Sequence, residues 1–104
     1  MFLVKTAIDL RVLVNNLKSE NKKIGFVATM GALHQGHLAL IQRSKSENDT
    51  TICSIFVNPR QFNDSSDLEK YPRPIDQDIL KLESAGNDIL FIPNPDDIYP
   101  DDFI

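Results

Sequence analysis

The sequence predicts an α/β fold, a doubly wound parallel sheet whose strands alternate with helices. Segments with apolar residues at helical spacing alternate with short apolar runs that are rich in β-branched residues. Those runs are apolar on both faces, which is typical of strands in a parallel sheet covered on both sides. Alternation of this kind predicts a parallel sheet with right-handed crossover connections. At 104 residues the chain suits one small domain.

The first half of the chain predicts two helices and two strands. The first helix begins at Thr6, where a hydroxyl cap precedes the acidic residue Asp9 three positions later. This helix should end within residues 19–23. The segments that follow are a strand at 24–29, a helix at 38–45 and a strand at 51–57, which is ended by Asn58-Pro59.

The second half opens with a long polar loop at residues 60–74, and long loops in compact domains are often functional. A helix begins near Ile75 and stops at Gly86, where glycine is a suitable cap. A third strand at 88–92 is ended by Pro93. The predicted order is therefore helix, strand, helix, strand, helix, strand.

Composition and charge exclude several classes of function. The chain has 11 basic and 15 acidic residues, a net charge of −4 and no basic stripe. We therefore expect no nucleic-acid partner, although a single nucleotide needs only a few donors. No apolar run approaches the length that spans a membrane, and the start MFLVK is too short for a secretory signal. We therefore expect no membrane partner. The lone cysteine, Cys53, permits no internal disulfide, which favours a reducing, cytoplasmic setting.

Two of the predicted strand ends carry polar and glycine-rich residues. Thr29-Met30-Gly31 ends the strand at 24–29, and residues 57–61 end the next strand. Doubly wound sheets bind ligands at the carboxyl ends of their strands. The two segments should therefore meet at one edge of the sheet and form a site.

The two histidines, His34 and His37, both lie in the stretch TMGALHQGH at residues 29–37, and three interpretations fit this spacing. A metal site would need a third or fourth ligand, and neither a further histidine nor a carboxylate lies in the stretch. A phosphate cradle would use Gly31 for a tight turn and Gly36 for close approach of the backbone. It would also use the free N–H groups of the following helix and the imidazole donors. Alternatively, both histidines are ordinary residues of a solvent-exposed helix start.

Four blocks of sequence, taken in order, resemble a known enzyme family. The first block, TMGALHQGH, contains the pattern His-x-Gly-His, which resembles the signature of the HIGH-type nucleotidyltransferase superfamily. With SIFVNPRQF at 54–62, DLEKYPR at 67–73 and DDIYP at 96–100, it resembles the pantothenate synthetase (pantoate–β-alanine ligase) family over residues 24–100. The resemblance implies a Rossmann-like sheet that is the N-terminal portion of a nucleotidyltransferase fold.

The resemblance implies an ATP-dependent ligase of pantothenate and coenzyme A biosynthesis. In that family the carboxylate of pantoate attacks the α-phosphorus of ATP, pyrophosphate leaves, and a pantoyl adenylate forms. The amine of β-alanine then displaces AMP and gives the amide, pantothenate. Magnesium accompanies the nucleotide, and full-length members are expected to be homodimers.

The resemblance also implies residue roles. His37 and His34 are the expected catalytic residues, in contact with the phosphates, with His37 as the proton donor. Gln61 is expected to bind both pantoate and β-alanine through its carboxamide, and Asn58 to help position β-alanine unless it only ends its strand. No direct metal ligand is expected. Asp78 is a candidate for an indirect magnesium contact, although its place in a first helical turn favours complementing the helix dipole. The expected ATP-binding residues are Met30, Gly31, Ala32, Leu33, His34, Gln35, Gly36 and His37.

Members of this family are longer than the present chain. Residues 1–104 would be the N-terminal part of a nucleotide-binding domain, truncated before the later triphosphate-binding segments and the C-terminal domain. We expect an incomplete sheet with uncovered apolar surface and negligible ligase activity of the chain alone. Two alternatives stay open. One is a non-catalytic fragment that binds a nucleotide or a partner chain, and the other is another HIGH-type nucleotidyltransferase, which would not need the NPRQF segment.

Overall fold

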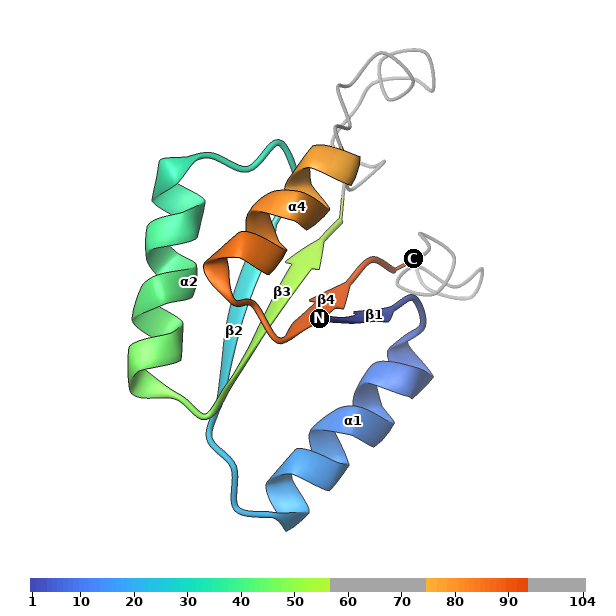
Figure 1. Cartoon of the computed structure of the whole chain (residues 1–104). Coiled ribbons are helices and arrows are strands. Elements are labelled where there is room, and N and C mark those ends of the chain that lie inside the picture. Colours follow the sequence, from blue (N-terminus) through green and yellow to red (C-terminus); the bar gives the residue numbers. More distant parts are fainter. Residues whose placement is uncertain (57–74, 94–104) are drawn as a thin grey trace, which may run out of the picture.

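A computed structural model describes residues 1–56 and 75–93 of the chain. Within them lies a four-stranded parallel sheet with the strand order β1-β4-β3-β2, flanked by helices (Figure 1). The predicted α/β fold is confirmed. The elements in chain order are β1 (Phe2–Val4), α1 (Ala7–Ser19), β2 (Ile24–Thr29), α2 (Gln35–Glu47), β3 (Thr50–Ile55), α4 (Ile75–Ala85) and β4 (Ile89–Phe91).

The main differences from the prediction are one strand that was not predicted and the start of one helix, and the ends of β3 and β4 differ by one or two residues. The sequence pattern did not predict β1, which pairs with β4 in the register Phe2↔Ile89 and Val4↔Phe91. Three residues carry no measurable periodicity, so only pairing with a distant strand identifies them. The second helix, α2, begins at Gln35 and not near Leu38, because its cap lies at His34. The predicted loop at 60–74 and the IYP block lie outside the described residues.

The sheet is covered on both faces. In Figure 1, α1 packs on one face, and α2 and α4 pack on the other. Alternate side chains of β3 point to opposite faces of the sheet. Cys53 and Ile55 belong to the core under α2 and α4, and Ile52 belongs to the core under α1. Burial raises the pKa of the Cys53 thiol to about 11, so this cysteine fills the core and is no nucleophile. The core beneath α2 and α4 consists of Val27, Leu33, Ile41, Cys53, Ile55, Leu82 and Leu90.

The two edge strands leave apolar side chains uncovered, as expected for an incomplete sheet. On β1, Phe2 is 70% exposed and Leu3 is 50% exposed, and on β2 Phe26 is 55% exposed. Among the described helices, none is long and apolar enough to cross a membrane.

The full pairing of β2 with β3 sets the geometry of the carboxyl edge. The register runs from Ile24↔Thr50 to Thr29↔Ile55, so the two strands end side by side. One further hydrogen bond, from the backbone N–H of Phe56 to the carbonyl of Thr29 at 3.0 Å, extends the pairing past the last register pair. The chain therefore leaves β2 and β3 at neighbouring points of one edge, as the sequence predicted.

Candidate active site

A tight turn connects the end of β2 to the start of α2. Gly31 and Ala32 have φ values of 90° and 53°, both in the left-handed region, which is unfavourable for a residue with a Cβ such as Ala32. The buried hydroxyl of Thr29 accepts a hydrogen bond from the N–H of Gly31 at 3.2 Å and donates one to the carbonyl of Ser54 at 2.8 Å. Thr29 therefore ties the turn to the neighbouring strand β3.

Asp78 and Lys81, one helical turn apart on α4, hold the same turn from the other side. The Asp78 side chain is 1% exposed, and its Oδ2 and Oδ1 accept hydrogen bonds from the N–H groups of Ala32 and Leu33, each at 2.9 Å. Lys81 Nζ donates to the carbonyl of Leu33 at 2.9 Å. The carboxylate of Asp78 thus serves the turn, which goes beyond the dipole role that the sequence favoured. Lys81 was missed, although it lies one helical turn from Asp78 and on the same side of α4.

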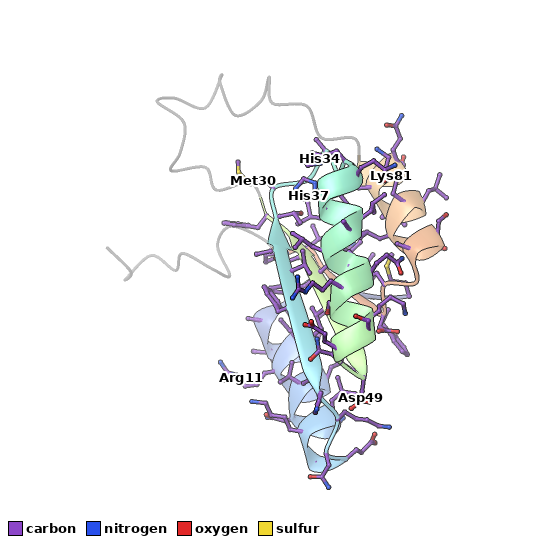
Figure 2. All side chains as sticks on the ribbon, turned by 90° about the vertical axis from the view of Figure 1, so that its left-hand side faces the viewer. Arg11, Met30, His34, His37, Asp49 and Lys81 are labelled. Atoms are coloured by element: carbon purple, nitrogen blue, oxygen red, sulfur yellow. The ribbon has the colours of Figure 1, made fainter. Side chains whose placement is uncertain are left out.

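The two histidines form a reciprocal cap at the start of α2. His34 is the N-cap residue, and its Nδ1 accepts a hydrogen bond from the N–H of Gly36 at 3.0 Å. His37 Nδ1 accepts one from the N–H of His34 at 3.1 Å, and the two ring centroids lie 4.1 Å apart. Figure 2 shows both rings at the end of the molecule where Met30 and Lys81 lie, opposite Arg11 and Asp49. The prediction that the backbone N–H groups here are free is therefore wrong for His34 and Gly36.

This capping fixes the tautomer of both neutral rings. A neutral imidazole whose Nδ1 accepts a hydrogen bond carries its proton on Nε2. Both His34 and His37 therefore hold an Nε2–H donor at the positive end of the α2 dipole. Desolvation lowers the pKa of His37 and the neighbouring His34 lowers it further, against an opposing effect of the Asp78 carboxylate. The His37 ring is thus neutral at pH 7, and it offers a donor to an anion without adding net charge.

Gly36 has a use that the sequence did not indicate. A Cβ at this position would lie 2.8 Å from Cε1 of the His34 ring and 3.1 Å from its Nδ1. Any larger residue would push the His34 ring away from its capping position. Gly36 therefore makes room for the cap, within the protein itself.

The predicted ATP-binding residues lie in the turn after β2 and the start of α2, but they differ in their exposure to solvent. Met30, Gln35 and the His34 ring are exposed, and His37 is half-buried. The Leu33 side chain is 2% exposed and belongs to the core beneath α2 and α4, so only its backbone faces the turn. Asn58 and Gln61 lie outside the described residues, and their roles stay predictions.

The described residues do not form a metal site. Residues 1–56 and 75–93 contain no group of three or more histidine, cysteine, aspartate or glutamate side chains placed to hold an ion. Asp78 does not fit the requirement for a ligand, because each of its oxygens already accepts a backbone hydrogen bond within a buried setting. Its predicted indirect contact with magnesium stays a prediction.

Fold and site together define the class of this chain. It is a Rossmann-like α/β protein with a nucleotidyltransferase-type histidine pair at the start of the helix that follows β2. The family model for pantoate-beta-alanine ligase matches residues 2–104, nearly the whole chain. The chain belongs to the pantoate-beta-alanine ligase family.

Individual relatives agree with this assignment. The pantothenate synthetase of Francisella philomiragia is 60% identical over 83 residues, covering 80% of this chain and 32% of the relative. That of Bacteroides fragilis is 48% identical and covers 97% of this chain and 36% of the relative. The chain thus spans about a third of the length of these curated relatives.

Solved structures give the same result. A crystal structure of pantoate-beta-alanine ligase from Francisella tularensis, complexed with beta-gamma ATP and beta-alanine, superimposes with a TM-score of 0.87 at 50% identity. The match covers 97% of this chain and 38% of that one. Pantothenate synthetase from Thermus thermophilus superimposes with a TM-score of 0.77 at 40% identity, covering 100% of this chain and 36% of that one.

Proposed function

We propose that this chain is the N-terminal part of the nucleotide-binding domain of an ATP-dependent ligase that condenses pantoate with β-alanine. The observation that carries the proposal is the pair of Nε2–H donors that His34 and His37 hold at the start of α2. Membership of the family supports it. So does the crystal structure of the Francisella tularensis enzyme, which is 50% identical and is complexed with a form of ATP and with β-alanine.

The reaction takes place in two steps. A carboxylate oxygen of pantoate forms a bond to the α-phosphorus of ATP while the bond to the pyrophosphate leaving group breaks, which gives pantoyl adenylate. The amine of β-alanine then attacks the acyl carbon, AMP leaves, and the amine loses a proton, which gives pantothenate. Both steps need in-line positioning and stabilisation of charge on phosphate oxygens more than covalent help from the protein.

The described residues can supply this stabilisation. The Nε2–H groups of His34 and His37 would donate to phosphate oxygens, and the α2 dipole would favour negative charge at the same place. When a phosphate binds, its negative charge favours a second proton on His37. That proton would take Nδ1 and displace the bond accepted from the His34 N–H, and the Nε2 proton could then pass to the leaving group. In the capped state Nδ1 of both rings accepts a backbone hydrogen bond, so contact with the phosphate would be made by Nε2.

Several parts of the proposal concern residues or partners outside the described structure. Gln61 would bind pantoate and β-alanine, and Asn58 would help with β-alanine. Magnesium would arrive with the nucleotide, and the described residues contribute no step through it. We further propose a cytoplasmic location and, for full-length members of the family, a homodimer.

The proposal includes negligible turnover by the isolated chain. The relatives are about three times as long, so the match leaves most of their length without a counterpart. This observation favours a second description of the isolated chain, a fragment that binds a nucleotide or a partner without catalysis. Purified chain given ATP, pantoate and β-alanine should form no pantothenate, and turnover would contradict this part of the proposal.

A hybrid enzyme tests the function itself. This chain would replace the matching part of the Francisella philomiragia relative, whose remaining sequence supplies the rest of the enzyme. We expect the hybrid to form pantothenate and to exchange pyrophosphate into ATP only when pantoate is present. His37→Gln should remove both activities, with Gln42→Ala, on the same helix, as the control. Exchange without pantoate would favour another HIGH-type nucleotidyltransferase.

A further inference from the structure

We propose that Asp78 and Lys81 act as positioning residues, a clamp through which α4 sets the orientation and the phosphate affinity of the histidine pair. The inference rests on the proposed function, because it concerns how the same site is held in its binding state. The clamp consists of the three hydrogen bonds that these two side chains make to the backbone of Ala32 and Leu33.

The clamp acts on the peptide units directly before the N-cap residue. Leu33 is held at both of its backbone polar groups, because its N–H donates to Asp78 and its carbonyl accepts from Lys81. Its side chain packs in the same core as Leu82 of α4. The peptide that precedes His34 is therefore fixed by α4. Since the His34 backbone N–H donates to the His37 ring, the orientation of both rings depends on α4.

The turn needs such support because its backbone is unfavourable. Ala32 has a φ of 53°, a conformation that a residue with a Cβ adopts only when its surroundings stabilise it. The hydrogen bond from the Ala32 N–H to Asp78 holds this conformation. A carboxylate is a stronger acceptor than a neutral carbonyl, so Asp78 is well suited to the task.

The buried charge of Asp78 also affects the proton affinity of the site. Among the described residues no cation lies in a salt bridge with this carboxylate, and its hydrogen bonds there come from two backbone N–H groups. The carboxylate raises the pKa of His37, against the lowering effects of desolvation and of His34. Asp78 thus favours the imidazolium that an arriving phosphate would stabilise.

The first experiment compares Asp78→Asn with Asp76→Asn in the full chain. Both aspartates lie in the first turn of α4, so the two variants change net charge and helix dipole alike, but Asp76 is exposed. For Asp78→Asn we expect about tenfold faster amide exchange at Ala32 and Leu33. We also expect altered ring ¹⁵N signals of His34 and His37, a lower pKa of His37 and about tenfold weaker ATP binding. Asp76→Asn should match the unmodified chain in all four measurements.

A second pair of variants avoids any change in the buried core. Lys81→Met removes the donor to the Leu33 carbonyl and keeps an apolar stem. Lys45→Met is the matched control, because Lys45 Nζ makes the same kind of bond, to the carbonyl of Gly86 at 2.9 Å, far along the chain from the turn. We expect a change in the ring signals and about threefold weaker ATP binding for Lys81→Met only.

The outcomes separate this inference from the function on which it rests. Unchanged ring signals and amide exchange in both Asp78→Asn and Lys81→Met would overturn the clamp. If Asp78→Asn does not fold, the Lys81→Met pair decides by the same measurements. If the unmodified chain binds no ATP, nucleotide binding by this chain is refuted, whereas the ring and amide measurements still support or overturn the clamp.

Discussion

The starts of α1 and α2 solve the same physical problem with different side chains. Each helix has 13 residues and needs partners for its first backbone N–H groups. At α1 the hydroxyl of Thr6 accepts from the N–H of Asp9 at 3.1 Å, which is a common cap. At α2 two imidazoles do the same work, although histidine is not a preferred cap residue. The α2 start therefore has a capacity that capping alone does not require, namely two Nε2–H donors.

The two starts also differ in how far their supports lie along the chain. The Thr6 cap reaches only three residues, and α1 has no buried residue. The peptide before His34 is held by Asp78 and Lys81, which are 45 and 48 residues from Leu33. The start of α1 is therefore stabilised by contacts within a few residues, whereas the start of α2 depends on the tertiary fold.

The largest expected effect is loss of anion binding when α2 receives an ordinary cap. The double variant His34→Ser/His37→Glu creates a common capping box, so the free energy of unfolding should stay within about 0.5 kcal/mol. ATP binding should weaken about a hundredfold, because two donors are lost and a carboxylate is added. Thermal unfolding and ATP titration measure the two effects, with Thr6→Ser at α1 as the control. Undiminished ATP binding would show that the rings serve the cap alone.

The next effect concerns the entry to α2. Thr29→Val keeps the shape of the side chain but removes its bonds to the Ser54 carbonyl and the Gly31 N–H. The loss of a buried bridging hydroxyl should cost about 2 kcal/mol and lower the melting temperature by about 10 °C. Thr50→Val is the control, because the Thr50 side chain is half-buried at the other end of the same strand pair. Equal melting temperatures for the two variants would contradict the bridging role.

A smaller effect is expected at the α1 start. Thr6→Ala removes the N-cap hydroxyl that accepts from Asp9 and should cost about 1 kcal/mol of stability. Since α1 lies on the other face of the sheet, ATP affinity should not change. Urea unfolding and ATP titration on the same sample would check both statements. A change in ATP affinity would mean that the starts of α1 and α2 are coupled.

The smallest effect is the pH dependence of stability. The folded state lowers the pKa of His37 below its ordinary value of 6.5, mainly by desolvation. Below about pH 6.5 the unfolded chain binds more protons at this site, so its contribution is complete above that pH and declines as pH falls. Urea midpoints at about pH 8 and about pH 5.5 should differ less in His37→Gln than in the unmodified chain. The Thr6 cap does not titrate, so Thr6→Ala should keep the full pH dependence.

Local signals in the sequence predicted the α/β fold and the cap at Thr6, because spacing and side-chain chemistry decide them within a few residues. They missed β1, since only Val4 of its three residues is buried and its partner strand lies at the other end of the described chain. They also missed Lys81 and the full role of Asp78, because a bond to the Leu33 backbone depends on how α4 packs. The histidine pair was found, but its capping role needed the helix boundary at Gln35.

The strand order has a consequence for the way in which the sheet assembles. Because β4 lies between β1 and β3, β1 has no neighbour among the described strands until residues 89–91 have been made. The β2–β3 pair, by contrast, can close as soon as residue 55 is available. The carboxyl end of that pair can therefore form during synthesis before Phe2–Val4 has a partner, and the later insertion of β4 joins β1 to β3.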